Sequence, residues 1–191
     1  IMFYIRGMIA PQPGTLLIAD PFLKDPNFLR TVVLICRHSK DEGSFGFTLN
    51  RLYDLTLGEV IPEMEGFENP IFIGGPVQMD SLHFIHQYPE YFNDCEKIDH
   101  NIFWGGDFEK LKLLMKDKVI DEQKIKFFIG YSGWATGQLE LEIEEKSWLS
   151  VKGTGNIVFN TALGDIWKAS LVQLGGNYEK LVHYPTDPQL N

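Results

Sequence analysis

Compact apolar runs near the start of the chain predict strands that are covered on both faces. Residues 14–20 and 31–36 are short and dominated by aliphatic side chains. A strand with one exposed face alternates apolar and polar residues instead. Residues 44–50 follow a polar turn and predict a hairpin partner for the second run. Further strands are expected at 70–73, 82–86, 101–104 and 124–131.

Two helices are indicated by an apolar residue at every third or fourth position. The first is predicted over 107–119, because Asp107 is placed to accept the first free backbone N–H groups. The second is predicted over 160–174, and Gly175 supplies a left-handed stop. A shorter helix is expected over 56–61, since it begins at a capping threonine and a proline follows it.

Residues 138–144 carry two conflicting patterns. Their sequence, Gln-Leu-Glu-Leu-Glu-Ile-Glu, alternates strictly between polar and apolar residues, which predicts a strand. The same residue types favour a helix, and acidic side chains near a helix start suit the helix dipole. We favour the helix. Interspersed strands and helices with hairpin-like turns then predict an α+β fold with a largely antiparallel or mixed sheet.

Length and composition are those of one globular domain spanning 1–191. The chain has 191 residues, of which 44% are hydrophobic and 23% charged, so disordered, collagen-like and coiled-coil classes are excluded. The net charge of −9 repels phosphate backbones. Six lysines gather between residues 110 and 126, but five acidic residues are interleaved with them from residue 107 onward. These charges argue against direct nucleic-acid binding.

The cysteine content predicts neither a disulfide framework nor a zinc site. Cys36 and Cys95 are far apart, with no CxxC motif. We therefore expect no metal and no cofactor. No apolar run approaches the roughly 18 residues of a membrane helix, and no signal peptide is recognisable at the start. A cytoplasmic location without membrane association is expected.

Several sequence blocks together resemble the YqgE/AlgH family. The early blocks are 14–21, 28–35 and 46–51, and 73–77 continues the match. The hallmark block is 130–140, Gly-Tyr-Ser-Gly-Trp-Ala-Thr-Gly-Gln-Leu-Glu, followed by Trp148 and Trp167. The resemblance covers nearly the whole chain in order.

The resemblance implies a bacterial cytosolic protein with an α+β fold. Its mixed, largely antiparallel, barrel-like sheet would be surrounded by helices. The family implies no established catalytic activity. Some members carry the label of transcriptional regulator, which names no mechanism.

Nine residues in or near these blocks are candidates for binding a ligand or a partner. They are Asn50, Arg51, Gly74, Gly75, His86, Tyr131, Trp134, Gln138 and Glu140. Paired glycines after a strand can form an anion nest or simply two tight turns. An arginine at a strand end can hold a carboxylate or make a structural ion pair. A lone histidine is more often a satisfied hydrogen-bonding residue.

No catalytic residue is assigned. The segment around Ser132 lacks the last glycine of the Gly-x-Ser-x-Gly elbow. We therefore favour a binding or regulatory protein over an enzyme. It would act through a protein partner or a small ligand, with indirect transcriptional regulation as one route. The alternative is a hydrolase or transferase whose pocket joins Gly74–Gly75, His86, Asn50–Arg51 and the Gln138/Glu140 pair.

Overall fold

A computed structural model describes residues 8–23 and 28–182 of the chain. The strands are β1 (Thr15–Ala19), β2 (Val32–Ser39), β3 (Gly43–Thr48), β4 (Leu52–Thr56), β5 (Pro70–Ile73), β6 (Val77–His86), β7 (Glu96–Asp99), β8 (Ile102–Trp104), β9 (Ile125–Trp134) and β10 (Trp148–Lys152). The α-helices are α1 (Leu57–Val60), α2 (Phe108–Lys116), α3 (Gln138–Glu144), α4 (Ile166–Leu174) and α5 (Tyr178–Leu181). Shorter turns are the 3-10 segments η1 (Pro62–Met64), η2 (Glu122–Lys124) and η4 (Leu163–Asp165) and the π-helical η3 (Asn156–Asn160).

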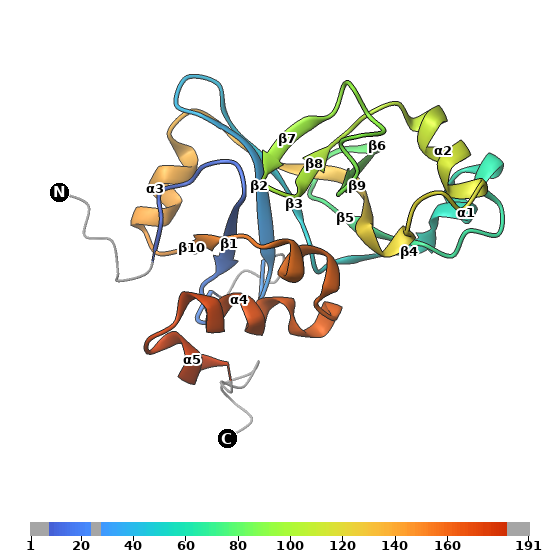
Figure 1. The fold of residues 1–191 in the computed structure, drawn as a ribbon. Helices are drawn as coiled ribbons and strands as arrows, with labels where there is room; N and C mark the ends of the chain where they lie inside the picture. Colours follow the sequence, from blue (N-terminus) through green and yellow to red (C-terminus); the bar gives the residue numbers. More distant parts are fainter. Residues whose placement is uncertain (1–7, 24–27, 183–191) are drawn as a thin grey trace.

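The strands form one curled, mixed sheet (Figure 1). Its main path runs β10-β1-β2-β3-β9-β6-β8-β7, and every neighbouring pair along that path is antiparallel. β5 adds the parallel element by pairing with β9, and β4 pairs with β5. The predicted α+β class, with a mixed and largely antiparallel barrel-like sheet, is confirmed.

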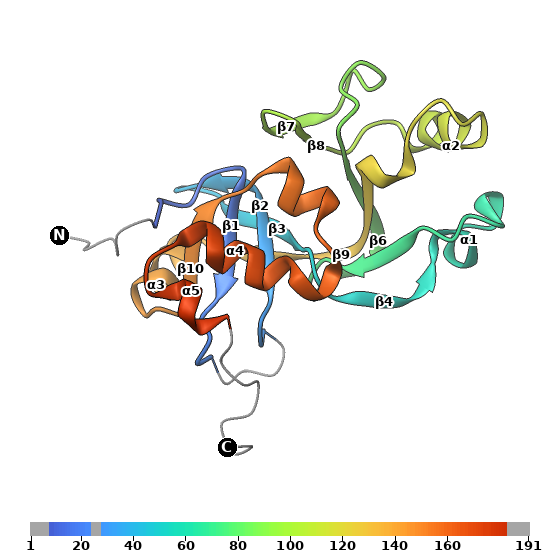
Figure 2. The ribbon, with the colours of Figure 1, turned by 60° about the horizontal axis from the view of Figure 1, so that its bottom comes forward.

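The strands β1 and β2 are buried on both faces, as their apolar runs predict. Leu16 and Ile18 pack in the cluster that contains α4, whereas Leu17 and Ala19 pack in the cluster that contains α3. All four side chains are fully buried. Figure 2 shows α4 lying across this part of the sheet, and α3 lies at the opposite end of the molecule from α1 and α2 (Figure 1).

Two predicted helix features are confirmed by the structure. Asp107 caps α2 by accepting a hydrogen bond from the Lys110 amide at 3.2 Å. The helix ends at Lys116, earlier than predicted, because Lys118 turns into the left-handed region with φ 54°. Residues 138–144 form α3, so residue propensity decides over alternation there. The alternating pattern survives only as Leu139 and Ile143 entering the core.

The single helix predicted over 160–174 is wrong in its first half. The chain forms η3 and then extends at Thr161 and Ala162, and α4 starts only at Ile166. The Thr161 hydroxyl donates to the Asn156 carbonyl at 3.2 Å, a local bond that competes with helix formation. The predicted stop is confirmed, because Gly175 has φ 76° and its amide donates to Leu171.

Three strands escaped the sequence patterns. β4 is short and has no buried position, and β7 buries only one residue. β10 follows α3 directly and forms a strand by pairing with β1, more than a hundred residues away in the chain. β6 and β9 are each longer than predicted. Pairing with distant strands, rather than local alternation, defines these elements.

The strand β9 changes its neighbour along one edge. Residues 127–129 pair with β5, and residues 132–134 pair with β3, while β6 occupies the other edge. Gly74 lies at this exchange: its amide donates to Ile129 at 2.9 Å, and its carbonyl accepts from the Thr48 amide at 2.8 Å and from the Ser132 hydroxyl at 3.0 Å. A Cβ atom on Gly74 would lie 2.3 Å from the Gly130 carbonyl oxygen. The backbones therefore meet only because residue 74 lacks a side chain.

We predict that Gly74→Ala destabilises the protein, because the new methyl group clashes with backbone that is hydrogen-bonded on both sides. The expected loss in the free energy of unfolding is about 1–3 kcal/mol, measured by urea denaturation. Gly164→Ala is the matched control, since nothing lies within 4 Å of a Cβ atom there. Equal stabilities of the two variants would contradict this account of Gly74.

Candidate functional site

An open groove lies where β2, β3, β6, β8 and β9 meet. Its volume is about 550 Å³, within the usual range for small-molecule sites. The rings of Phe45, His83, Trp104 and Tyr131 line it, and Arg37 also borders it. We call this site the aromatic groove. Of the nine predicted site residues, it contains Tyr131 and Trp134.

Phe45 is the centre of the ring cluster in the aromatic groove. Its ring centroid lies 4.8 Å from that of Trp104 and 5.7 Å from that of Tyr131, both in edge-to-face geometry. Directly opposite Phe45 in the β3–β9 register stands Gly133. Because Gly133 has no side chain, the position of β9 directly opposite Phe45 adds no contact to its ring, and the β9 contact comes from Tyr131, two residues earlier.

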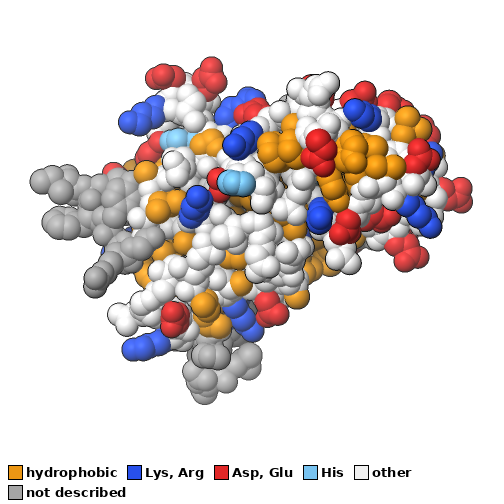
Figure 3. Space-filling model, viewed as in Figure 1, with side chains coloured by type: hydrophobic (Ala, Val, Ile, Leu, Met, Phe, Trp, Pro, Cys, Tyr) orange, Lys and Arg blue, Asp and Glu red, His pale blue; other side chains and the backbone are white. Residues whose placement is uncertain are grey.

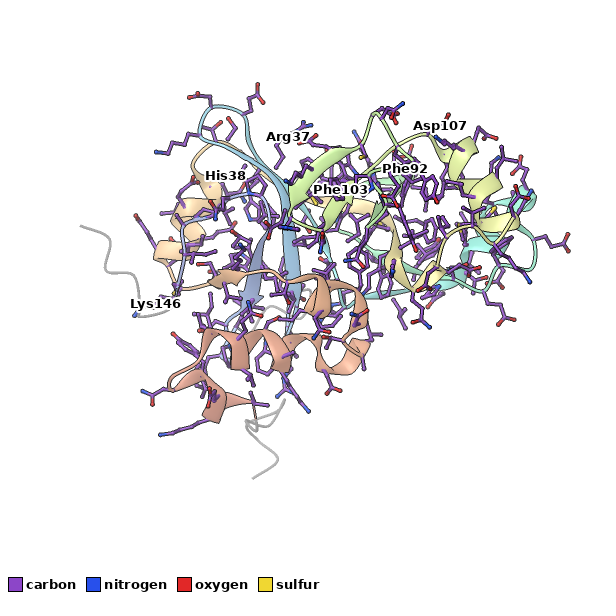
Figure 4. The ribbon with its side chains drawn as sticks, in the orientation of Figure 1. Arg37, His38, Phe92, Phe103, Asp107 and Lys146 are labelled. Atoms are coloured by element: carbon purple, nitrogen blue, oxygen red, sulfur yellow. The ribbon has the colours of Figure 1, made fainter. Side chains whose placement is uncertain are left out.

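Arg37 is held at the groove by one ion pair and two aromatic rings. Its guanidinium donates two hydrogen bonds to the Glu96 carboxylate, the Nε bond at 3.2 Å. Its Cζ atom lies 5.6 Å from the Phe45 ring centroid and 5.7 Å from that of Trp104. Figure 4 shows Arg37 on β2 beside β7, the strand that carries Glu96. The Arg37 side chain remains 51% exposed, so a ligand can reach it.

His83 provides a buried polar atom without a partner. Its ring lies 6.1 Å from the Tyr131 ring and 5.3 Å from the Phe47 ring. Among the described residues, its Nε2 atom has no hydrogen-bond partner. Burial lowers the pKa of His83 below its ordinary value, so the neutral imidazole is favoured at neutral pH.

Gln78 brings backbone strain to the same groove. It is exposed and has φ 50°, in the left-handed region that non-glycine residues rarely adopt. Such conformations cost on the order of 1 kcal/mol and cluster at functional sites.

The hallmark residues Trp134 and Gln138 converge on one carboxylate. Glu142 accepts hydrogen bonds from the indole N–H groups of Trp134 and Trp148, both at 2.8 Å, and from the Gln138 side-chain amide at 2.9 Å. The two indole rings lie edge to face at 6.2 Å. The Glu142 carboxylate therefore fixes the Trp134 ring in the cluster that contains α3, while Trp134 also borders the aromatic groove.

Glu140 belongs to a polar chain that leads back to the groove. Its carboxylate lies 3.5 Å from His38 Nε2, and His38 Nδ1 lies 2.8 Å from the hydroxyl of Ser44, a groove residue. Figure 4 places His38 on β2 beside α3. This chain ties the start of α3 to the β2–β3 hairpin.

Asn50 and Arg51 fasten the segment that leads into β2. The Asn50 side chain accepts from the Val32 amide at 2.9 Å and donates to the Arg30 carbonyl at 2.7 Å. Arg51 donates to the Leu29 carbonyl at 3.3 Å. These contacts give both residues a structural role.

His86 is fully buried and engaged at both ring nitrogens. Nδ1 accepts from the Tyr88 amide at 3.1 Å, so Nε2 carries the proton that is donated to the Gly105 carbonyl at 3.0 Å. Burial lowers the pKa of His86.

Gly75, like Gly74, packs against β9: a Cβ atom there would lie 2.3 Å from the Ser132 nitrogen.

The structure separates the residues that the hydrolase or transferase alternative needs in one pocket. His86 is enclosed, and Asn50 and Arg51 bind the segment before β2. Gln138 lies with Glu142 in a separate small hollow of about 310 Å³, beside α3. Conversely, sequence reasoning missed Arg37, Phe45, His83 and Trp104 as groove residues. One sequence signal for the groove was available: Gly133, in the hallmark block, offers no side chain to the residue opposite it on the neighbouring strand.

Within the described ranges, no group of three or more His, Cys, Asp or Glu side chains is placed to hold a metal ion. In the same part of the chain, none of the helices has the length and apolarity needed to cross a membrane.

Comparison with known proteins identifies the family of this chain. The AlgH-like family profile matches residues 16–179. A UPF0301 protein of Chlorobium limicola is 42% identical over 180 residues, covering 94% of this chain and 96% of its own length. A UPF0301 protein of Cytophaga hutchinsonii is 41% identical over 179 residues, covering 93% and 98%.

Solved structures agree with this assignment. The solution structure of the AlgH protein from Pseudomonas aeruginosa has a TM-score of 0.71 at 26% identity, covering 93% of this chain and 98% of that one. A crystal structure of a Corynebacterium diphtheriae protein shares the fold, with a TM-score of 0.76 at 24% identity, covering 96% and 100%. This chain belongs to the AlgH-like family, which confirms the resemblance noted in its sequence blocks.

We predict that Glu142→Ala destabilises the protein, because two indole N–H groups and one amide lose their shared acceptor. The expected loss in the free energy of unfolding is about 1–3 kcal/mol in urea denaturation followed by tryptophan fluorescence. Glu144→Ala on the exposed face of α3 serves as the control and changes stability by less than about 0.5 kcal/mol. Equal effects of the two substitutions would show that the Glu142 contacts contribute nothing.

A second prediction concerns pH. Both His83 and His86 have a lowered pKa in the folded protein, so their contribution to stability is complete above the ordinary value of 6.5 and is lost as the pH falls below it. We expect the free energy of unfolding to decrease from about pH 7 to about pH 5. His83→Phe keeps a ring among its aromatic neighbours and reduces this slope, leaving the part due to His86. An unchanged slope in the variant would contradict the assignment to His83.

Proposed function

We propose that this protein is a binding protein with a regulatory role, and that the aromatic groove is its binding site. The occupant is a planar aromatic group that carries an anionic or hydrogen-bonding substituent. Such a group is found in a small ligand or in a side chain of a protein partner. The observation that carries the proposal is an open groove lined by aromatic side chains, in which the residue of β9 directly opposite Phe45 is a glycine, Gly133.

The groove offers both parts of the recognition. The edge-to-face cluster of Phe45, Trp104 and Tyr131 provides apolar contact area, and aromatic pairs contribute about 0.5–1.5 kcal/mol beyond area burial. Arg37 supplies a charged donor at the groove, and His83 supplies a polar atom that a ligand can satisfy. Aromatic and arginine side chains are also the residues that dominate protein interfaces.

Charge favours a partner other than DNA. The net charge is −9, and Figure 3 shows basic and acidic side chains interspersed on the face in view. A DNA-binding face needs a contiguous basic surface. A regulatory effect on transcription would therefore pass through a protein partner. The free thiols and the acidic net charge of the chain are consistent with a cytoplasmic location.

Filling the groove tests this proposal. Gly133→Leu places a side chain over the Phe45 ring, and residue 133 tolerates it because its Cβ atom would meet only the Tyr131 and Val77 side chains, at 3.4 Å or more. Indole-3-acetate and benzoate, titrated against labelled protein by NMR, are expected to shift groove resonances. Gly133→Leu and Trp104→Ala should weaken binding at least about tenfold, whereas Val172→Ala on α4 should not.

A protein occupant is tested in parallel. A benzoylphenylalanine photocrosslinker at Gln78, which is exposed beside the groove, should capture one partner in cells. The same crosslinker at Lys168, on α4, is the control. Two results together overturn the proposal. Neither aromatic probe binds, and Gly133→Leu leaves every crosslink intact.

A further inference from the structure

A second hollow lies between the start of β5, the junction of η2 with β9, and η3. Its volume is about 650 Å³, and it is separate from the aromatic groove. Phe72 and Lys126 form its strand side, and Asn160 of η3 contributes to its helical side. We call it the lysine pocket.

Lys126 occupies a core-facing position of β9, a strand paired on both edges. Its neighbours Ile125 and Phe127 pack in the cluster that contains α2, whereas Phe128 packs in the opposite cluster, with the residues of η3. Strand alternation places Lys126 on the Phe128 side. Only 9% of Lys126 is exposed, although lysine is almost never buried in proteins without a charged partner.

The amine of Lys126 has an apolar neighbour and no ion pair. Its Nζ atom lies 4.7 Å from the Phe72 ring centroid, and it makes no hydrogen bond or ion pair within the described part of the chain. The charged groups that line the same pocket are Glu68, before β5, and Glu122, in η2. Burial lowers the pKa of Lys126 to about 8, so a neutral amine is accessible near physiological pH.

Two further features mark the pocket. η3 is a π-helical segment, and such segments are frequent at functional sites. Asn69 also lines the pocket, and its Oδ1 atom is buried without a hydrogen-bond donor among the described residues. A hydroxyl or N–H group of a bound molecule would satisfy this acceptor after a small shift of the side chain.

We propose that Lys126 is a nucleophilic amine that captures small aldehydes or ketones, preferably ones bearing a hydroxyl group, in the lysine pocket as an imine. An isolated cation–π contact with Phe72 would explain the position of the ammonium ion. It explains neither the adjoining open volume nor the unpaired acceptor of Asn69. A neutral amine shielded from water is the usual form of a reactive lysine.

The chemistry is balanced without a co-reactant. The Nζ lone pair forms a bond to the carbonyl carbon, and the carbonyl π electrons move to oxygen. A proton passes from nitrogen to that oxygen to give the carbinolamine. Loss of hydroxide as water, with one further proton from nitrogen, leaves the C=N bond. Amine and carbonyl thus give imine and one water, with no change in oxidation level.

Reductive trapping tests the proposal on the intact chain. The wild-type protein is incubated with glycolaldehyde and cyanoborohydride at about pH 7.5, and the modified lysines are quantified by peptide mass spectrometry. The neutral fraction of an amine with a lowered pKa exceeds that of an ordinary lysine by roughly two orders of magnitude at this pH. After allowance for shielding and weaker basicity, Lys126 should react about tenfold faster than exposed Lys168 and Lys180.

Two variants separate capture in the pocket from other routes. Asn160→Trp narrows the pocket from η3 and should slow labelling of Lys126 severalfold while leaving Lys168 unchanged. Lys126→Arg keeps the cation over Phe72 and should abolish labelling of that peptide only. Labelling of Lys126 at or below the rate of Lys168, or labelling that is insensitive to Asn160→Trp, overturns the proposal. Both outcomes can be read in folded protein and are independent of the aromatic groove.

Discussion

The close approach of three backbone segments at Gly74 is the constraint on which the rest of this structure depends. A carbonyl oxygen of β9 lies 2.3 Å from the position that a Cβ atom of residue 74 would take. The Gly74 carbonyl accepts hydrogen bonds from the Thr48 amide and the Ser132 hydroxyl. This junction lets β9 leave β5 and continue along β3 without a gap in hydrogen bonding. The sheet therefore curls around one strand, and the last residues of β9 reach the β2–β3 hairpin. Without that exchange, Tyr131 would not meet Phe45.

Local sequence predicted the elements whose stability is local or whose burial is complete. The apolar runs of β1 and β2 predict strands that are buried on both faces, and Asp107 predicts the start of α2. The failures have two physical causes. β10 exists because it pairs with β1, and the turn at Thr161 exists because its hydroxyl finds a carbonyl five residues back. Contacts that are long-range, or that compete with a helix locally, leave no periodic signature.

The candidate site shows the same division. The hallmark block spans the end of β9 and the start of α3, where Gln138 bonds to Glu142 and Glu140 lies beside His38. Apart from Tyr131, the side chains that form the groove come from β2, β3, β6 and β8, and only the sheet register brings them together. No spacing rule connects Arg37 with Trp104. His83 lies three residues before His86, and strand alternation places their side chains on opposite faces of β6.

One strand therefore serves both pockets, and its hydrogen bonding limits how they can behave. Lys126 lies toward the start of β9, and Tyr131 and Gly133 lie toward its end. Because β9 is paired on both edges along most of its length, neither pocket can widen by moving this wall. Any adjustment to an occupant must come from the opposite sides. In the aromatic groove these are the exposed Arg37–Glu96 pair and the strained backbone at Gln78, near the start of β6. In the lysine pocket it is η3, whose π-helical hydrogen bonding is weaker than that of an α-helix.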